Sequence, residues 1–193
     1  MTWTAATLLA AFQSLAPAEY AKDPPRFATI AVAGESVVAE YGQRFVKGPR
    51  MLGAAVATAI RKESAFWLDV HDGSRVGPSG EVCLVQIHPS NPHWQRVGAP
   101  LREALAGTDY ESTRWCLATG AVSLSSALSH CWAQRFWKNW AQAMWTQYHY
   151  GNRCWLSPHA YKRTAMMRRI AYTRWEPTQE HRRLVAEARE RIR

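Results

Sequence analysis

Hydrophobic residues recur at helical intervals along most of the chain. Between Met51 and Phe66, the apolar residues Leu52, Val56 and Ile60 follow one another at intervals of four, which predicts the buried face of a helix. Similar patterns predict further helices, in the N-terminal segment as far as residue 21 and over 27–46, 112–131, 132–148, 157–172 and the basic, polar segment 173–193.

The segment 69–89 does not follow this pattern. It contains Asp-Gly, Gly-Pro and Ser-Gly pairs, which are typical of turns, and then the alternating stretch Val82–Ile87. Alternation is typical of a strand. We therefore expect a loop with one or two short strands, or a turn leading into a brief helix. The predicted fold class is mainly α, with a small central β or loop excursion between the helices.

The length of 193 residues predicts one domain with a sizeable core. Its expected parts are N-terminal helices over 1–50, a central core over 51–172 and a basic C-terminal helix over 173–193. No apolar run approaches the ~20 residues that a membrane-spanning helix needs. The N-terminal segment has no basic region before its apolar stretch, and Gln13 interrupts that stretch. It is therefore predicted to be a first helix and not a signal peptide.

Charge narrows the class of partner. The 24 Lys and Arg residues outnumber the 15 Asp and Glu residues, which gives a formal net charge of +9. This excess predicts an anionic partner: nucleic acid, a membrane surface or a cell-wall polymer. A basic surface that only confers solubility is the alternative. The ten Trp residues offer flat faces for stacking on sugars or bases, but the aromatic residues over 132–145 have the helical spacing of a core.

Four cysteines, Cys83, Cys116, Cys131 and Cys154, permit two disulfides. Cys116 and Cys131 fall on one predicted helix, where a rise of ~1.5 Å per residue separates them by about 22 Å. A disulfide requires Cα atoms within about 4.4–6.8 Å, so this pair is excluded. The order of the chain favours Cys83–Cys116 and Cys131–Cys154. Four reduced, buried thiols are the alternative.

No metal site and no cofactor are predicted. Cys83, His88 and His93 lie five residues apart, a spacing that matches neither a CxxC pair nor an HExxH helix.

Glu63 occupies a position where the helical pattern predicts an apolar residue. It continues the apolar stripe of Leu52, Val56 and Ile60 at the last turn of a predicted buried helix. The helix could simply fray there and let the side chain reach water. The alternative is a carboxyl group that burial keeps protonated near neutral pH, which is what a general acid for glycosidic cleavage requires.

Three blocks of sequence carry a resemblance to a known family. They are Glu63-Ser64 at the end of a helix, "GEVCLVQIHP" at 80–89 and "YHYG" at 148–151. In this order they resemble the soluble lytic transglycosylase and goose-type lysozyme group of the lysozyme-like superfamily. That family has Glu-Ser at a helix end, a Gly-Ala-x-Gly-Leu-Met-Gln-Ile-x-Pro segment and a Tyr-Asn-Ala-Gly turn. The matching residues are Glu63, Ser64, Gly80, Leu84, Gln86, Ile87, Pro89, Tyr148 and Gly151.

The resemblance implies cleavage of the β-1,4 bond between N-acetylmuramic acid and N-acetylglucosamine in peptidoglycan. Glu63 would protonate the leaving oxygen and, in a lytic transglycosylase, then accept the proton of the muramic C6 hydroxyl as a 1,6-anhydro ring closes. Gln86 would line the cleft, and Tyr148 would contact the sugar or orient Glu63. The remaining residues of these blocks with an expected substrate-binding role are Ser64, Tyr150 and Gly151. A helix C-terminal polar residue is the alternative for Ser64.

The chain departs from the family pattern at Glu81, where the family has alanine, and at Cys83, where it has glycine. Glu81 is either a surface charge on a turn or the second carboxylate that a hydrolase uses. Asp69 and Asp72 are weaker candidates for the second role. Transglycosylase is favoured over hydrolase. A module that binds wall glycan or nucleic acid without cleaving it is the alternative of another class.

The expected partner is bacterial peptidoglycan, with an anionic wall or membrane surface as a further partner; nucleic acid is not expected, and the protein is expected to be a monomer. Disulfides favour the periplasm or the cell exterior. Without a clear signal peptide, a phage enzyme for host lysis or wall penetration fits these expectations.

Overall fold

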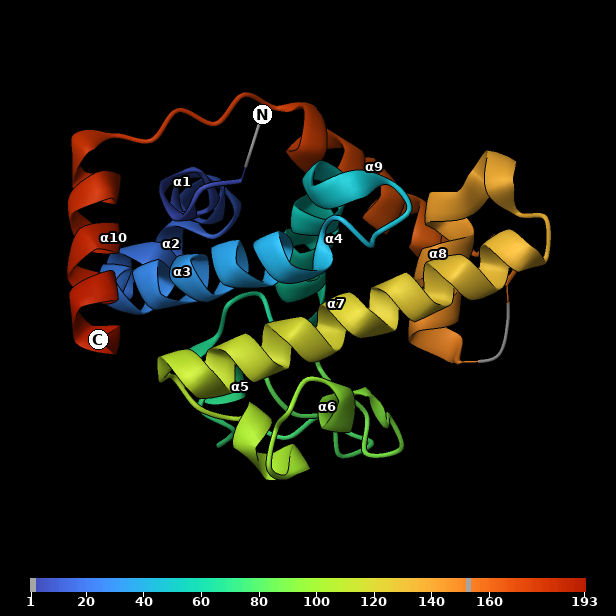
Figure 1. Cartoon of the computed structure of the whole chain (residues 1–193), viewed down its shortest axis with the longest axis horizontal. Coiled ribbons are helices and arrows are strands. Elements are labelled where there is room, and N and C mark those ends of the chain that lie inside the picture. Colours follow the sequence, from blue (N-terminus) through green and yellow to red (C-terminus); the bar gives the residue numbers. More distant parts are fainter. Residues whose placement is uncertain (1–2, 152–153) are drawn as a thin grey trace.

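The computed structural model describes residues 3–151 and 154–193. Helices account for 69% of the described residues, and no strand occurs within these two ranges, which confirms the mainly α class (Figure 1). The α-helices are α1 (Ala5–Leu15), α2 (Pro17–Lys22), α3 (Pro24–Tyr41), α4 (Gly48–Glu63), α5 (Leu68–His71), α6 (His93–Arg96), α7 (Tyr110–Ala133), α8 (Trp140–Tyr150), α9 (Pro158–Tyr172) and α10 (Gln179–Ile192); 3₁₀ helices span Arg102–Leu105 and Trp137–Asn139. None of the described helices is both long and apolar enough to cross a bilayer.

The longest helix, α7, runs through the middle of the molecule (Figure 1). It begins at Asp109, whose side chain accepts a hydrogen bond from the Ser112 amide, an N-cap that satisfies one of the free amides at the helix start. Its apolar residues Leu117, Leu124 and Leu128 are fully buried. Because α3 and α8 both pack against it, α7 joins the N-terminal helices to the C-terminal ones.

Helix α4 is buried at every position from Met51 to Ile60 and packs against α3, α7 and α9. It ends at Glu63, three residues earlier than the sequence predicts, because Ala65 and Phe66 adopt left-handed backbone with φ of 50° and 65°. The Phe66 ring is fully buried and stacks on Phe27 with ring centroids 5.1 Å apart. This turn directs the chain away from the core immediately after Glu63.

A buried polar contact supports that turn from the other side. The Arg26 guanidinium, only 6% exposed, donates a 2.9 Å hydrogen bond to the Phe66 carbonyl and lies 3.5 Å from His71 Nδ1. His71 in turn contacts the Thr113 hydroxyl of α7 at 2.9 Å. The end of α4, the start of α3 and the start of α7 are therefore tied together.

The predicted N-terminal helix divides at Ala16, where Pro17 begins α2. The C-terminal helix α10 packs on α1 and α3 and buries Leu184, Val185 and Ala188, so one face belongs to the main core. Its other face is charged, as predicted.

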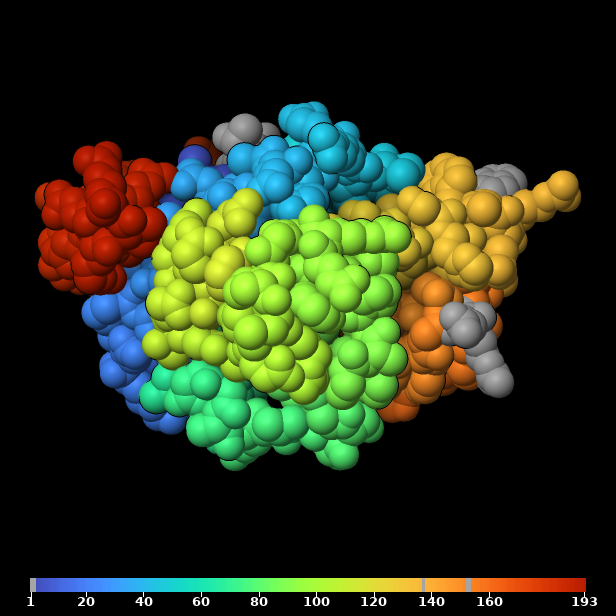
Figure 2. Space-filling view, turned by 60° about the horizontal axis from the view of Figure 1, so that its bottom comes forward, coloured from blue at the N-terminus to red at the C-terminus, as the bar shows by residue number. Residues whose placement is uncertain are grey.

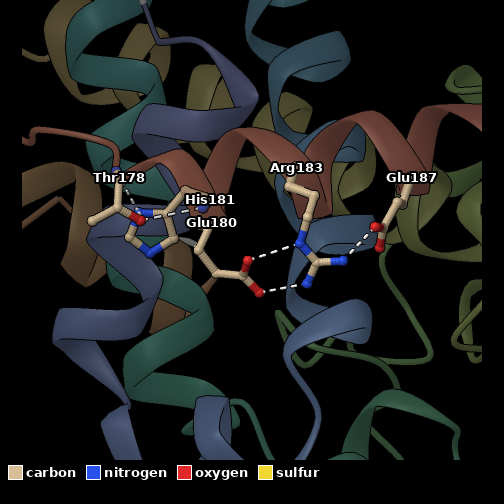
Figure 3. Close-up of polar contacts among 5 residues, drawn as sticks. All are labelled: Thr178, Glu180, His181, Arg183 and Glu187. Carbon is tan, nitrogen blue, oxygen red and sulfur yellow. Dashed lines mark hydrogen bonds and ion pairs between the residues drawn. The ribbon is translucent and has the colours of Figure 1, made fainter.

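The N-terminus of α10 has a capping box between Thr178 and His181, which Figure 3 shows beside the exposed Arg183. Arg183 lies between Glu180 and Glu187 and pairs with both. Exposed pairs of this kind contribute at most about 1 kcal/mol each to stability, so we assign the position of α10 to its buried face.

The central excursion contains less β structure than predicted. Within the described residues, the expectation of one or two short strands is wrong: Val82 and Ile87 form a single antiparallel bridge around the turn Cys83–Gln86. Cys83 and Gln86 both have positive φ, of 65° and 51°, because the chain reverses too tightly for a ladder to extend. Figure 2 shows this segment in green along the lower part of one face, below the yellow-green residues that follow it in the chain.

This turn packs closely on α7. A Cβ atom on Gly120 of α7 would lie 2.9 Å from the Val85 side chain, closer than side chains normally approach. A glycine at position 120 therefore lets the central excursion pack directly on the helix.

Two further predicted helices are shorter in the structure. The helix over 27–46 ends at Tyr41, and turns follow it. The helix over 132–148 begins only at Trp140, after a turn in which Arg135 has a φ of 66°.

The two disulfides join the pairs that the sequence predicts, Cys83–Cys116 and Cys131–Cys154, with Cα atoms 6.1 and 5.3 Å apart. Cys116 and Cys131 lie on the same helix, α7. The first disulfide ties the central excursion to α7, and the second ties the end of α7 to the segment after α8.

Candidate active site

A cleft of about 700 Å³ lies between the central excursion and the helices. The lining residues of α4, α7 and α8, together with Gly151, form one side of the cleft, which we call the helical wall. The lining residues of the segment 78–93 form the other side, which we call the loop wall. The helical wall comprises Glu63, Ser123, Ser126, Ala127, Gln147, Tyr148, His149, Tyr150 and Gly151; the loop wall comprises Pro78, Glu81, Gln86, His88, Ser90, Asn91, Pro92 and His93.

Glu63 reaches this cleft from the last residue of α4, with its side chain 14% exposed. Its carboxylate accepts a 2.6 Å hydrogen bond from the guanidinium of Arg163 in α9, which is 13% exposed. This is the geometry of an ion pair. It differs from the protonated, unpaired carboxyl group that is one of the two interpretations of Glu63 from the sequence. The cost of burying most of the Glu63 side chain is thus offset by an ion-pair partner one hundred residues away in the chain.

Tyr148 lies beside this pair. Its hydroxyl donates a 2.9 Å hydrogen bond to the Val85 carbonyl of the central excursion, so it links the two walls. Burial and then the negative charge of Glu63 raise the pKa of Tyr148, against the opposing effect of Arg163. The phenol therefore stays protonated near neutral pH and serves as a donor beside the carboxylate.

Glu81 and Gln86 lie together on the loop wall. A Cβ atom on Gly77 would lie 2.4 Å from Glu81 Oε2 and 2.7 Å from Gln86 Oε1, so both side chains fill the space that Gly77 leaves open. The Glu81 carboxylate accepts a hydrogen bond from the Ser79 amide at 2.9 Å. Gln86 Nε2 donates to the Cys83 carbonyl at 3.1 Å, which fixes its orientation.

Tyr150 and Gly151 close the helical wall at the end of α8. Tyr150 is 46% exposed and packs edge-on against His149. Gly151 has a φ of 78°, which ends the helix. Both line the cleft, as a substrate-binding role requires.

The expected substrate-binding role of Ser64 is not supported. Ser64 is 1% exposed and is not among the residues that line the cleft. Its hydroxyl donates to the Ile60 carbonyl at 2.9 Å and accepts from the Phe66 amide. It is the helix C-terminal polar residue of the alternative interpretation, and it supports the turn after Glu63.

The structure adds polar residues to the site that the motifs did not indicate. Asn91 donates to the Ser123 hydroxyl at 2.9 Å and so joins the loop wall to α7. His93 Nδ1 is buried without a hydrogen-bond partner among the described residues, and burial lowers the pKa of this imidazole. Arg163 had no local signal, because its partner is distant in the chain.

A metal site formed by Cys83, His88 and His93 is excluded, because the Cys83 sulfur is bonded to Cys116. The described residues contain no group of three or more His, Cys, Asp or Glu side chains placed to hold a metal ion.

Comparison of the chain with protein-family models, with curated proteins and with solved structures found no significant match.

Proposed function

We propose that this protein cleaves the β-1,4 bond between N-acetylmuramic acid and N-acetylglucosamine in peptidoglycan, as a lytic transglycosylase with Glu63 as general acid and base. The observation that carries the proposal is the position of Glu63, a carboxylate that lines a cleft at the end of a helix buried from Met51 to Ile60. Gln86, Tyr148 and Gly151, from the other two blocks of the family resemblance, line the same cleft.

The transglycosylase reaction needs one carboxyl group. In the first step, protonated Glu63 gives its proton to the glycosidic oxygen as the bond to C1 of the muramic residue breaks. In the second, the Glu63 carboxylate accepts the proton of the C6 hydroxyl, whose oxygen bonds to C1. Glu63 ends in its starting protonation state, and no water is consumed.

Arg163 has a distinct effect on each step. Its guanidinium at 2.6 Å suits the ionised Glu63 that acts as base, because a charge-assisted hydrogen bond favours the carboxylate. The acid step requires Glu63 to carry a proton and this contact to open. We propose that substrate entering the cleft opens it.

Hydrolysis is the second candidate, and the position of Glu81 favours it. Its carboxylate lines the same cleft as Glu63, where a second carboxylate activates water or stabilises the oxocarbenium ion. Water would then take the place of the C6 hydroxyl, and the product would be a reducing muramic residue.

We propose that the protein works at the cell wall, in the periplasm or outside the cell. Its two disulfides are compatible with an oxidising compartment. A phage lysis or wall-penetrating enzyme is the biological setting that we propose.

The test is mass spectrometry of the products that the protein releases from purified peptidoglycan. We expect muropeptides ending in 1,6-anhydro-muramic acid from the wild type and from Glu190→Gln, an exposed control on α10. Glu63→Gln should lower their yield by at least ~10²-fold, the usual contribution of general acid–base catalysis.

Glu81→Gln separates the two candidate reactions. Anhydro products that persist in this variant would support the transglycosylase. Reducing products that disappear with either carboxylate would establish the hydrolase. Absence of products from the wild type would overturn the enzymatic proposal in favour of a module that binds wall glycan.

A further inference from the structure

The ion pair between Glu63 and Arg163 lies at the inner end of a cluster of cations. Arg61 and Lys62 occupy the last turn of α4, and Lys162 and Arg169 lie seven residues apart on α9, a spacing that puts them on one face of that helix. The two helices pack against each other (Figure 1). We call these four residues the cationic cluster.

The cationic cluster has no acidic partner. Among residues 3–151 and 154–193, none of its four side chains forms an ion pair or a hydrogen bond, whereas Arg163 pairs with Glu63. Lys62, Lys162 and Arg169 are exposed, and Arg61 is half-buried.

The cations are close enough to affect one another. Burial, followed by the positive charges of Arg163, Arg61, Lys162 and Arg169, lowers the pKa of Lys62. Repulsion of this kind destabilises the folded protein unless an anion relieves it. A neutral sugar chain in the cleft would not relieve this repulsion.

We propose that the cationic cluster binds the carboxylates of the stem peptides of peptidoglycan while the glycan occupies the adjacent cleft. This inference rests on the proposed function and specifies its substrate: a strand that carries its peptides, in preference to bare glycan. Arg163 contacts Glu63 at 2.6 Å and is close enough to Lys62 for its charge to act on that side chain, so an anionic substituent on the sugar at Glu63 lies within reach of the cluster. The same substituent is a competing partner for the Arg163 guanidinium and provides a means to release Glu63.

Two triple variants test the proposal. Lys62→Gln/Lys162→Gln/Arg169→Gln removes three charges of the cationic cluster. Arg182→Gln/Arg191→Gln/Arg193→Gln removes three charges from the exposed side of α10, which packs on α1 and α3 rather than on α9.

The readout is binding by calorimetry, with Glu63→Gln added to the wild type and to both triple variants so that no probe is cleaved. The probes are a peptidoglycan tetrasaccharide carrying its stem peptides and chitotetraose, which is neutral. At low salt the wild type and the α10 variant should bind the peptide-bearing probe about tenfold tighter than chitotetraose, since several exposed ion pairs, each weak, act together. The cluster variant should lose this preference and keep its affinity for chitotetraose.

Equal preference in the cluster variant and the wild type would overturn the proposal, as would a wild type that binds both probes equally. Loss of binding to vesicles of anionic lipid in the cluster variant, with the preference for peptides intact, would assign the cluster to a membrane surface and also overturn it. The product analysis above reports separately on the enzymatic proposal: peptide preference without cleavage contradicts only the reaction, and cleavage without preference contradicts only this inference.

Discussion

The helical wall of the cleft carries Glu63 and Tyr148 on helices that pack into the core, whereas the loop wall carries Glu81 and Gln86 on a segment without a long helix. Every residue of α4 from Met51 to Ile60 is buried, so repeated apolar contacts set the position of Glu63. The loop wall depends instead on a few individual interactions.

These interactions can be named one by one. The Cys83 disulfide and the hydrogen bond from Asn91 to Ser123 fix the loop wall to α7, and Arg102 donates to the Gly80 carbonyl at 2.8 Å. Single substitutions in the loop wall should therefore alter the site with little effect on the helices, while the helical wall should resist change until the fold itself is lost.

The largest expected effect on stability comes from removing the Cys83–Cys116 disulfide. Its sequence separation of 33 residues predicts that Cys83→Ser/Cys116→Ser loses about 3–4 kcal/mol of unfolding free energy, because the unfolded chain is no longer cross-linked. The yield of muropeptides should also fall, since the turn that carries Gln86 is no longer joined to α7. Urea unfolding and the muropeptide assay measure the two effects.

The second disulfide is the matched control. Cys131–Cys154 closes 23 residues, so Cys131→Ser/Cys154→Ser should lose a similar free energy, about 3 kcal/mol. This disulfide ties the end of α7 to the segment after α8 and not to the loop wall, so the variant without it should retain more activity below its unfolding temperature. Equal activity losses in the two variants would contradict the distinction between the walls.

The next effect is a pH dependence of stability at the base of the central excursion. Burial, and then the charge of Arg26, lower the pKa of His71 from 6.5 to about 3. His71 is thus neutral in the folded protein but gains a proton in the unfolded chain below pH 6.5. The stability that neutral His71 contributes is fully present above pH 6.5 and is lost as pH falls toward 3. Over this range the free energy of unfolding should fall with a slope approaching ~1.4 kcal/mol per pH unit.

The measurement is urea unfolding between pH 7.5 and 4 for the wild type and His71→Gln. The variant should show a shallower pH dependence, because glutamine does not titrate. Parallel curves for the two proteins would show that His71 titrates alike in both states and would exclude this origin.

How far the sequence predicts the structure differs between the two walls. The apolar stripe of Leu52, Val56 and Ile60 identifies the helix that carries Glu63, since helical spacing of buried residues is a local property. The same periodicity places Cys116 and Cys131 on one helix, and that restriction, together with the order of the chain, leads to the observed disulfides. Helix ends were predicted less well, because left-handed residues such as Phe66 and Arg135 have no distinctive local sequence.

Contacts between distant segments lie beyond such reasoning. Glu63 and Arg163 are one hundred residues apart, and no local pattern connects them. Ser64 lies outside the cleft for a related reason: adjacency to Glu63 in sequence does not place a side chain in the same cleft when the helix ends between them. The alternation at Val82–Ile87 indicated strands, but the tight turn at Cys83 and Gln86 limits the β structure to a single bridge.

A smaller effect is expected at the ion pair between Glu63 and Arg163. Both side chains are mostly buried, so removing either one leaves a charge without its partner. A double-mutant cycle with Glu63→Gln and Arg163→Gln should give a coupling energy of about 1–2 kcal/mol at neutral pH, above that of exposed pairs. Urea unfolding of the four proteins measures it, with Arg183→Gln as an exposed control. A coupling energy near zero would mean that the pair does not persist in solution.

The smallest effect on stability, and the most direct test of the loop wall, is expected for Gly77→Ala. The new Cβ would meet the ends of two flexible side chains, Glu81 at 2.4 Å and Gln86 at 2.7 Å, and would touch the Glu81 Cβ at 3.0 Å. Both can turn away, so the loss of stability should stay within about 1 kcal/mol. Displacement of these two side chains should still lower the rate of cleavage roughly tenfold, because small shifts of positioning groups strongly reduce rates.

Ser79→Ala on the same turn is the control for Gly77→Ala, since it keeps the backbone amide that donates a hydrogen bond to the Glu81 carboxylate. Circular dichroism and the muropeptide assay compare the two variants. If Gly77→Ala cleaves as fast as Ser79→Ala, the loop wall only encloses the cleft, and the reaction depends on Glu63 and the helical wall. If it cleaves more slowly while remaining folded, Glu81 or Gln86 acts on the substrate, and Glu81→Gln then distinguishes a second carboxylate from a positioning amide.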